Sequence, residues 1–468
     1  MMAREIAKRT DPQLSDGDVE RLFGVDDKLV RACEAALLDA RYDEVDRLTE
    51  PLHASDLADL VEELHGPVRA RLIDHLRPRL DPETLAHMDE VVLDVVLDAM
   101  EPAEVAAVIT ALDTDDAVDV IEDLPTKDQR QILEQLSPPD RAYLEEALTY
   151  PEDSAGRLMQ REIVTVPETW TVGETIDDMR RRADELPRDV YDVYIVDDDG
   201  KPVGVLPLSR LIRNQRDVKV ADIMSVDLHP VRVAMDQEEV ALMFHQYGLV
   251  SAAVIDAENR LAGVITADDV VHVVHEEAEE DLMHLGGVTE DDFYEAVLHT
   301  TRARFPWLLF NLLTIIVASI AIGLFDETIK QIVALAILMP IVASMGGNAG
   351  TQTLTVAVRA LAMKELTTTN SRRVVGKEIV VGGINGLLFA AVMGPIAWLW
   401  FGDVSIGAVI AAAMIINLIA AGFAGIATPI VLDRMKIDPA IASTVVLTGI
   451  TDVVGFVAFL GLAALVLL

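Results

Sequence analysis

The sequence predicts a multidomain fold: an all-helical N-terminal superhelix, a repeated α/β region, a long acidic helix and a C-terminal α-helical membrane domain. Three observations predict this order. Leucines recur every twelve residues from Leu112 to Leu148, β-branched strands alternate twice with amphipathic helices, and five long apolar segments fill the last third. With 468 residues, 51% of them hydrophobic, the chain is too long for one domain and too apolar to be soluble throughout.

Charge is divided very unevenly along the chain. Before Arg302 there are 70 acidic and 28 basic residues, a net charge of about −42, whereas the remainder has 8 acidic and 10 basic residues. Such an acidic surface repels nucleic acid and attracts cations, so no nucleic-acid partner is expected. Two explanations compete for the acidity. One is sensing of divalent cations; the other is solubility in a salt-rich, halophile-like cytoplasm, which 9 lysines against 29 arginines favour.

The N-terminal region, residues 1–150, is expected to be helical and cytosolic. Its one cysteine, Cys33, excludes an intramolecular disulfide framework, and the first ten residues lack the apolar core of a signal peptide. The twelve-residue repeat predicts stacked short helices that serve packing or docking. Asp115, Asp116 and Asp119 lie on adjacent turns of one helix start, where a divalent ion would relieve their repulsion. An acidic N-terminus favoured by the helix dipole explains the same pattern equally well.

The middle region consists of two copies of one pattern, at residues 151–218 and 219–271. Each copy has a strand, a helix, a two-strand hairpin and a closing helix. The copies resemble a tandem pair of cystathionine-β-synthase-type (CBS) domains, in which a Gly-x-x-Thr-x-x-Asp turn often binds adenosine nucleotides. The second copy has this turn at Gly263, Thr266 and Asp269, and the first copy lacks it. The resemblance therefore implies a site for ATP or another adenosine nucleotide at Thr266 and Asp269.

An acidic connecting helix is expected over residues 272–300. Acidic residues lie on neighbouring turns at Glu276, Glu277, Glu280 and Asp281, without a comparable number of bases. Like charges at this spacing weaken a helix, so a cation is expected nearby.

Five apolar segments within residues 301–468 are each long enough to span a bilayer. Basic residues gather in the connections after the second and the fourth of them, which predicts a cytoplasmic N-terminus and a C-terminus outside. The segments are approximately Phe305–Phe325, Ile329–Ala349, Ile379–Phe401, Val404–Leu432 and Pro439–Leu468.

The last segment contains a lone carboxylate, Asp452. It lies about 20 Å along a helix that starts at Pro439, near the middle of a hydrocarbon layer about 30 Å thick. A carboxylate at that depth costs at least ~2.5 kcal/mol and normally faces water or a partner. No lysine or arginine follows Lys436, which favours a cation site in a pore. Hydrogen bonds to Thr448, Thr451 or the backbone are the structural alternative.

The second segment contains the run MPIVASMGGNAGTQT, residues 339–353. Pro340 and the three glycines from Gly346 to Gly350 are expected to interrupt the helix, which is tolerated at membrane depth only where the backbone faces protein or water. The run would then offer carbonyls and the Asn348 side chain to a hydrated ion. Close helix packing through small residues is the alternative.

Five features in order resemble the MgtE family of magnesium channels over essentially the whole chain. They are YPEDSAGRLM from Tyr150, the paired CBS domains, the acidic helix, GGNAGTQ from Gly346 and DPA…TDVVGF from Asp438. The resemblance implies a homodimeric channel in the cell membrane, not an enzyme, with Mg²⁺ as substrate and regulator. It also implies that cytosolic Mg²⁺ binds between the N-terminal domain, the CBS pair and the connecting, or plug, helix and closes the channel. The regulatory residues it implies are Asp438, Glu277, Glu280, Asp281, Glu238, Asp269, Asp115 and Asp119.

The resemblance places Asp452 in the pore, on the two-fold axis of the dimer. Because Mg²⁺ sheds its waters reluctantly, we expect the two Asp452 groups to supply charge to a hydrated ion. Asn348 and the carbonyls of Ala349 and Thr448 would contact its water shell.

Two alternatives to a Mg²⁺ channel stay open. One is a channel for another divalent ion, such as Co²⁺ or Mn²⁺. The other is a CBS-regulated membrane enzyme, for example an intramembrane protease. The metalloprotease form would need a His-Glu-x-x-His pair inside the membrane, and no histidine follows His299.

Overall fold

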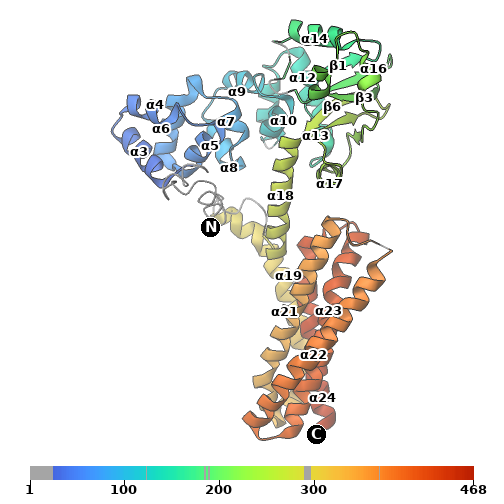
Figure 1. Ribbon diagram of the computed structural model, residues 1–468. Helices are drawn as coiled ribbons and strands as arrows, with labels where there is room; N and C mark the ends of the chain where they lie inside the picture. The colour runs from blue at the N-terminus through green and yellow to red at the C-terminus, as the bar shows by residue number, and fades with distance from the viewer. Residues whose placement is uncertain (1–24, 123, 184–185, 188–189, 289–296, 368) are drawn as a thin grey trace, which may run out of the picture. The chain divides into compact units, whose positions relative to one another are not determined.

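The structure is a computed structural model that describes residues 25–122, 124–183, 186–187, 190–288, 297–367 and 369–468, without the side chains of residues 90 and 441–443. The chain divides into two compact units, Met1–Val274 and His275–Leu468. Figure 1 shows the helices and strands of each unit.

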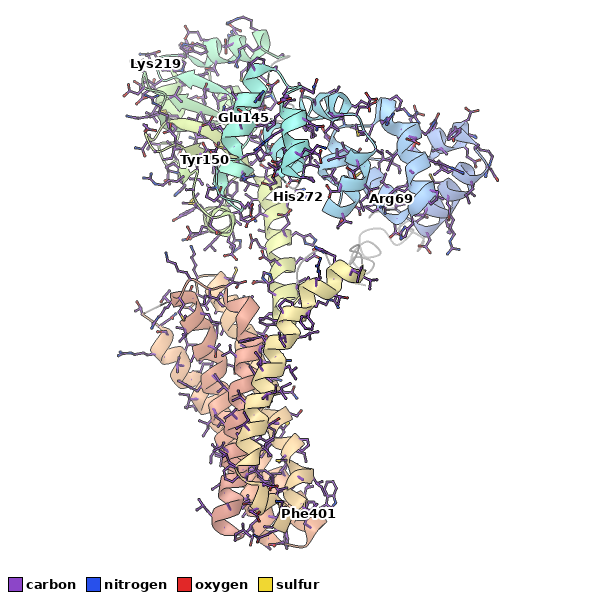
Figure 2. All side chains as sticks on the ribbon, turned by 180° about the vertical axis from the view of Figure 1, so that it is seen from behind. Arg69, Glu145, Tyr150, Lys219, His272 and Phe401 are labelled. Carbon is purple, nitrogen blue, oxygen red and sulfur yellow. The ribbon has the colours of Figure 1, made fainter. Side chains whose placement is uncertain are left out.

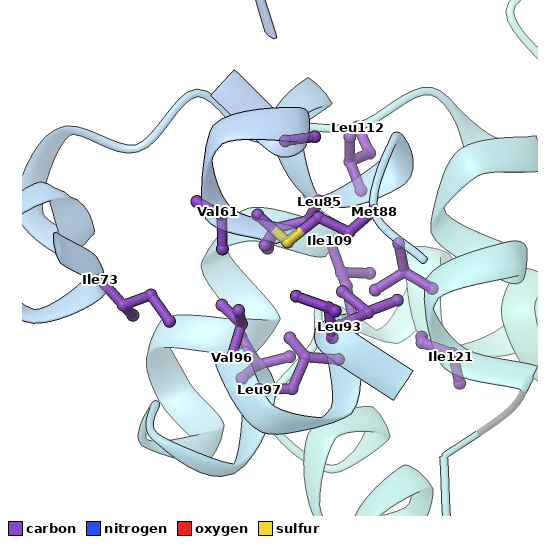
Figure 3. Close-up of a cluster of buried hydrophobic side chains, with 14 of the residues drawn as sticks. Val61, Ile73, Leu85, Met88, Leu93, Val96, Leu97, Ile109, Leu112 and Ile121 are labelled. Atoms are coloured by element: carbon purple, nitrogen blue, oxygen red, sulfur yellow. The ribbon is translucent and has the colours of Figure 1, made fainter. Parts of the chain in front are cut away.

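The first part of unit 1 is a stack of short helices around one apolar core, as predicted. Figure 3 shows part of this core, in which Leu85, Val96 and Ile121 are fully buried. The stacked short helices predicted from the leucine repeat are confirmed. Leu112 and Leu124 of the repeat are buried and each lies just after the end of a helix. The helices are α3 (Asp27–Leu38), α4 (Tyr42–Thr49), α5 (Ala54–Glu63), α6 (Gly66–Leu76), η1 (Arg77–Arg79), α7 (Glu83–Ala86), α8 (Glu90–Asp98), α9 (Pro102–Ile109), α10 (Thr114–Glu122), α11 (Thr126–Leu133) and α12 (Pro138–Ala147).

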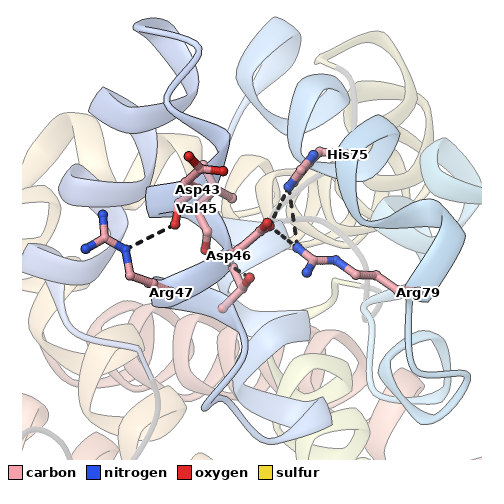
Figure 4. A network of polar contacts seen from close by, with 7 residues as sticks. Asp43, Val45, Asp46, Arg47, His75 and Arg79 are labelled. Carbon is pink, nitrogen blue, oxygen red and sulfur yellow. Dashed lines mark hydrogen bonds and ion pairs between the residues drawn. The ribbon is translucent and has the colours of Figure 1, made fainter.

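Polar contacts join the early helices at their surface. The Asp46 carboxylate of α4 accepts hydrogen bonds from Arg79 and from the ring of His75 (Figure 4). The hydrogen bond from His75, together with Arg79, holds the pKa of Asp46 below its usual range. This network connects α4 with α6 and η1 and belongs to the scaffold.

The second part of unit 1 contains the two predicted α/β copies. Each has a three-stranded sheet in which the first strand pairs parallel with the second and the second pairs antiparallel with the third. Short helix α13 (Ala155–Leu158) precedes them. The first copy has β1 (Thr165–Pro167), α14 (Val172–Arg181), β2 (Asp192–Val196), β3 (Pro202–Pro207) and α15 (Leu208–Arg213); the second has α16 (Val220–Ile223), β4 (Val231–Arg232), α17 (Gln237–Tyr247), β5 (Ser251–Ile255) and β6 (Leu261–Thr266).

Helix α18 (Ala267–Gly286) closes the second copy and continues into the acidic stretch as one helix. Early in α18 lies His272, which Figure 2 labels. Its ring centroid is 5.9 Å from that of His87. The helix ends earlier than the expected range of 272–300, because Gly287 has a φ of +73°, a left-handed conformation that favours glycine and ends helices. Residues 289–296 of that range lie outside the described residues.

Unit 2 contains five helices that are long and apolar enough to cross a membrane, which confirms the predicted number for the described part of the chain. Their cores run side by side in Figure 1. The helix ends lie within a few residues of the predicted ones, with three exceptions: α19 begins before Phe305, α21 extends beyond Ala349, and α22 begins before Ile379. The helices are α19 (Val297–Gly323), α21 (Ala334–Ala362), α22 (Ser371–Phe401), α23 (Val404–Arg434) and α24 (Pro439–Val466), with short α20 (Asp326–Gln331) after the first.

The predicted interruption of the second membrane helix is wrong. Helix α21 is continuous from Ala334 to Ala362 and includes Pro340 and the glycines. A Cβ on Gly346 would overlap the side chain of Asn417, and a Cβ on Gly350 would lie 2.9 Å from the side chain of Leu447. Gly346 and Gly350 therefore admit the neighbouring helices α23 and α24 at close range, which is the packing alternative, whereas a Cβ on Gly347 would meet nothing within 4 Å.

Candidate cation sites

The first candidate site is the Asp452 carboxylate in α24. It is half-buried, and it makes no hydrogen bond or ion pair with any residue that the structure describes. The neighbouring hydroxyls are used elsewhere: Thr451 donates to the carbonyls of Leu447 and Thr448, and Thr448 donates to the carbonyl of Thr444. The alternative in which these threonines hold the carboxylate is therefore not observed. A carboxylate without a partner in an apolar helix is suited to a cation or its water shell.

The other expected pore residues lie on α21 and α24, which pack against each other. Asn348 is exposed and Ala349 and Thr448 are partly buried. Within the described residues, no hydrogen bond joins Asn348 to Asp452. Since both helices are regular at these positions, the carbonyls of Ala349 and Thr448 each already accept bonds within their helix and keep limited capacity for water.

Asn417 of α23 is a residue that the sequence reasoning assigned to no site. It is 1% exposed, and its Nδ2 donates to the carbonyl of Val342 at 2.8 Å. Its Oδ1 is buried without a partner among the described residues. A Cβ on Gly346 or on Gly455 would collide with this side chain, so Asn417 lies between α21 and α24. In the sequence, the signal for this residue was an asparagine inside an apolar segment. The sequence could not show that its side chain lies between α21 and α24, because that depends on how the helices pack.

The second candidate site lies where the end of α18 meets the start of α24, within unit 2. Asp438 caps α24 through Oδ1, which accepts from the amide of Ala440 at 2.7 Å. Its Oδ2 lies 3.1 Å from Nδ1 of His284, and the same nitrogen lies 3.4 Å from Oε1 of Glu280. Burial, followed by the charge of Asp438, raises the pKa of Asp281. The structure thus brings three expected acids together and adds His284, which the sequence reasoning did not single out.

Contacts of the chain next to this site fix the position of the α18 terminus. The hydroxyl of Thr444 donates to the carbonyl of Leu285 at 3.2 Å. The side chain of Leu285 packs against buried residues that include Leu354 and Leu447. Glu277 lies one turn before Glu280 and Asp281 on α18 and is partly buried.

The third candidate site lies in unit 1, between α10 and the first turn of α18. Burial, followed by the charges of Asp269 and Asp116, raises the pKa of Asp115 well above its usual range. Oδ1 of Asp115 is shielded from solvent and has no hydrogen-bond partner among the described residues. Burial, with the charges of Asp113 and Asp269, raises the pKa of Asp116 to about 7. This is a group of mutually repelling carboxylates that a cation would stabilise.

Asp269 belongs to the same group although two hydrogen bonds favour its charged form. The amide and hydroxyl of Thr266 donate to Oδ2 of Asp269 at 2.9 and 2.7 Å, yet burial still raises its pKa. The structure therefore brings together Asp115 and Asp269, as expected, together with Asp116. Asp119 and Glu238 are exposed, one on α10 and the other in the first turn of α17.

The expected nucleotide turn lines a narrow cleft between the two α/β copies. The cleft has a volume of about 20 Å³, and its lining includes Thr266, Tyr194 and Ser251. Hydrogen bonds across the cleft hold its two sides together. The hydroxyl oxygens of Tyr194 and Ser251 are 2.6 Å apart, and the Ser251 hydroxyl donates to Oδ2 of Asp192 at 2.6 Å. A nucleotide would need this cleft to open.

A five-helix membrane unit with a partnerless carboxylate, joined to acidic soluble domains with clustered carboxylates, defines a membrane transporter of cations with a regulatory part. Comparisons with known families agree. The family MgtE, described as a divalent cation transporter, matches residues 339–462, the MgtE intracellular N domain matches 52–153, and the CBS domain matches 155–217 and 220–276.

Similar proteins bear the same family name. The magnesium transporter MgtE of Thermus thermophilus is 35% identical over 321 residues, which cover 68% of this chain and 71% of that protein. The magnesium transporter MgtE of Bacillus subtilis is 31% identical over 315 residues, covering 67% and 70%. The chain belongs to the MgtE family.

Two solved structures are similar to the soluble part. One is the cytosolic domain of the Mg²⁺ channel MgtE in complex with ATP, at 33% identity and a TM-score of 0.48, covering 52% of this chain and 99% of that chain. The other is the soluble part of a magnesium transporter, at 28% identity and a TM-score of 0.46, covering 54% and 98%.

Proposed function

We propose that this protein is a Mg²⁺ channel of the cell membrane that closes when cytosolic Mg²⁺ binds to its soluble part. The observation that carries the transport function is the Asp452 carboxylate, which has no partner among the described residues and lies within an apolar helix. The relatives named magnesium transporters support Mg²⁺ as the ion. The basic connections of the membrane unit support a cytoplasmic N-terminus and a C-terminus outside.

In a homodimer with the ion path on its two-fold axis, two Asp452 carboxylates would face one hydrated ion. Mg²⁺ keeps most of its waters, so two charges and a few polar atoms select it better than a full cage of ligands. Asn348 would contact the water shell through its exposed amide. Because α21 is a continuous helix, Ala349 and Thr448 would contribute only the remaining capacity of their helical carbonyls.

Closure would use the two groups of carboxylates outside the membrane. In unit 1, Mg²⁺ bound at Asp115 and Asp269 would neutralise carboxylates whose pKa values are raised by burial and mutual repulsion. In unit 2, Mg²⁺ bound near Glu280, Asp281 and Asp438 would attach α18 to the start of α24. Glu277, Asp119 and Glu238 would extend these sites.

Loss of Mg²⁺ would leave the carboxylates of these sites uncompensated and favour the open form. The switch requires only that the closed form binds Mg²⁺ more tightly than the open form, and several weak sites together supply that difference.

The same soluble part would also bind ATP or another adenosine nucleotide at Thr266 and Asp269, after the cleft opens. The Gly-x-x-Thr-x-x-Asp turn supports this part of the proposal. Titration of the full-length protein with a fluorescent ATP analogue, against a Thr266→Val variant, tests it. Equal binding by both proteins would remove the nucleotide from the proposal.

Substitution of the pore carboxylate tests the proposal directly. In proteoliposomes, Asp452→Asn should reduce Mg²⁺ uptake at least about tenfold, since even outer partners of a metal site contribute about 10- to 100-fold. Asp403→Asn is the matched control, because Asp403 caps α23 by accepting from the amide of Ser405 and asparagine also caps helices well.

Uptake by the Asp403→Asn variant should equal that of the parent. If Asp452→Asn also conducts Mg²⁺ like the parent, the aspartate is structural. Uptake of Co²⁺ or Mn²⁺ without Mg²⁺ would replace the proposed substrate.

A further inference from the structure

His284 lies between two carboxylates that come from two different helices. Its Nδ1 is 3.1 Å from Oδ2 of Asp438 and 3.4 Å from Oε1 of Glu280. One ligand atom from each of the three residues lies within 4.8 Å of the other two. Glu280 and His284 are one turn apart on α18, and Asp438 is the N-cap residue of α24.

These distances fit a shared ion. Two ligand atoms about 2.0–2.2 Å from a metal, at adjacent corners of a tetrahedron or octahedron, are about 2.8–3.6 Å apart. Both nitrogen–oxygen distances at His284 lie in that range. The two oxygens of Asp438 have different partners: Oδ1 caps helix α24, and Oδ2 faces His284.

The set of ligand atoms differs from that of a magnesium site. Mg²⁺ prefers oxygen atoms alone, whereas an imidazole nitrogen favours first-row transition ions, which bind mixed nitrogen and oxygen sites more tightly. We propose that Glu280, His284 and Asp438 form a binding site for a divalent transition ion of the Mn²⁺, Co²⁺ and Zn²⁺ class. In the channel proposed above, on which this regulatory role rests, the ion would join α18 to α24 and close the path at lower concentrations than Mg²⁺ does.

One further observation supports a preformed site at this junction. The contacts of Leu285 with Thr444 and the apolar cluster place the end of α18 without the ion. The ion would therefore bind ligand atoms that are already positioned.

A protonated His284 that merely pairs with both carboxylates would give the same distances, so the test must detect a metal–nitrogen bond. Mn²⁺ bound to the purified full-length protein should show electron spin-echo modulation from a directly coordinated ¹⁴N. His284→Gln keeps a hydrogen-bonding side chain of similar length but has no imidazole nitrogen, and should lose this modulation. His275→Gln, at an exposed position of the same helix, is the control and should keep it.

Ion competition provides the second readout. Zn²⁺ affinity of the full-length protein should fall at least about tenfold in His284→Gln, while Mg²⁺ affinity stays close to that of the parent. Equal losses for Zn²⁺ and Mg²⁺ would show that His284 only positions the acids, and would overturn the proposal. Nitrogen modulation that persists in His284→Gln, or is absent from the parent, would overturn it as well.

These measurements also separate this site from the function of the whole channel. Spin-echo modulation requires no transport, so a His284-dependent signal in a protein that conducts no Mg²⁺ would support the site and contradict the channel. Normal Mg²⁺ conduction with no metal–nitrogen signal would do the reverse.

Discussion

Asp115 combines burial, a partnerless oxygen and two neighbouring carboxylates, and the sequence predicted only part of this. The spacing of acids at the start of α10 indicated repulsion, and the family resemblance indicated Asp115 and Asp269. The sequence could not show that Asp116 also has a pKa raised to about 7, because its burial depends on how α10 packs in unit 1. The sequence did not predict a role for His284 for a similar reason, because its partner Asp438 is 154 positions away in the chain.

The raised pKa values predict how stability depends on pH and Mg²⁺. The pKa of an aspartate in the unfolded chain is about 3.9, whereas the pKa of Asp116 in the folded protein is raised to about 7. Between these values the folded state binds more protons, so the free energy of unfolding falls as pH rises. The stabilisation is fully present below about pH 4 and is lost as pH rises through about 7.

Mg²⁺ should therefore stabilise the full-length protein more at about pH 8 than at about pH 5, because protons occupy the carboxylates at the lower pH. Calorimetry in detergent with and without Mg²⁺ measures this difference. Asp116→Asn should reduce the pH dependence, whereas Glu134→Gln, at an exposed position just after α11, should not. An equal gain from Mg²⁺ at both pH values would contradict the carboxylate mechanism.

Helix α21 shows where reasoning at the level of elements succeeded and failed. Length and apolarity predicted the five membrane helices, because a segment that spans the bilayer must satisfy its own backbone. They did not predict whether glycines break a helix or admit a neighbour, since both effects use the same residues. At Gly346 the structure shows the second effect. The Asn417 side chain of α23 lies so close to α21 that a Cβ on Gly346 would overlap it.

Gly346→Ala should consequently destabilise the membrane unit by about 1–3 kcal/mol, the usual cost of overpacking a filled site. It should also lower Mg²⁺ uptake, because α21 would move relative to α24. Gly376→Ala is the matched control: Gly376 lies in α22, and a Cβ there would have nothing within 4 Å. Unfolding in mixed detergent micelles compares the two. Equal stability of both variants would mean that the close approach at Asn417 is not strained by a methyl group.

At the scale of the whole molecule, the uneven charge and the motif order predicted that acidic soluble domains precede a membrane domain. The helical stack, the paired α/β copies and the five spans all follow from periodicities that are local in sequence. The two carboxylate sites outside the membrane do not, because each joins residues from helices far apart in the chain. Acidity that serves solubility and acidity that binds ions look alike in a sequence, and burial separates them: Oδ1 of the partly buried Asp115 is shielded from solvent, whereas Asp119 is exposed.

In the proposed mechanism, Mg²⁺ both passes through this protein and closes it from the cytoplasmic side. The most direct measurement is Mg²⁺ current in inside-out membrane patches from cells that express the full chain, with Mg²⁺ at the cytoplasmic face raised stepwise. We expect a current at low cytoplasmic Mg²⁺ that falls steeply and reversibly as several weak sites fill. A Mg²⁺ current that is independent of cytoplasmic Mg²⁺, or the absence of any Mg²⁺ current, would contradict it.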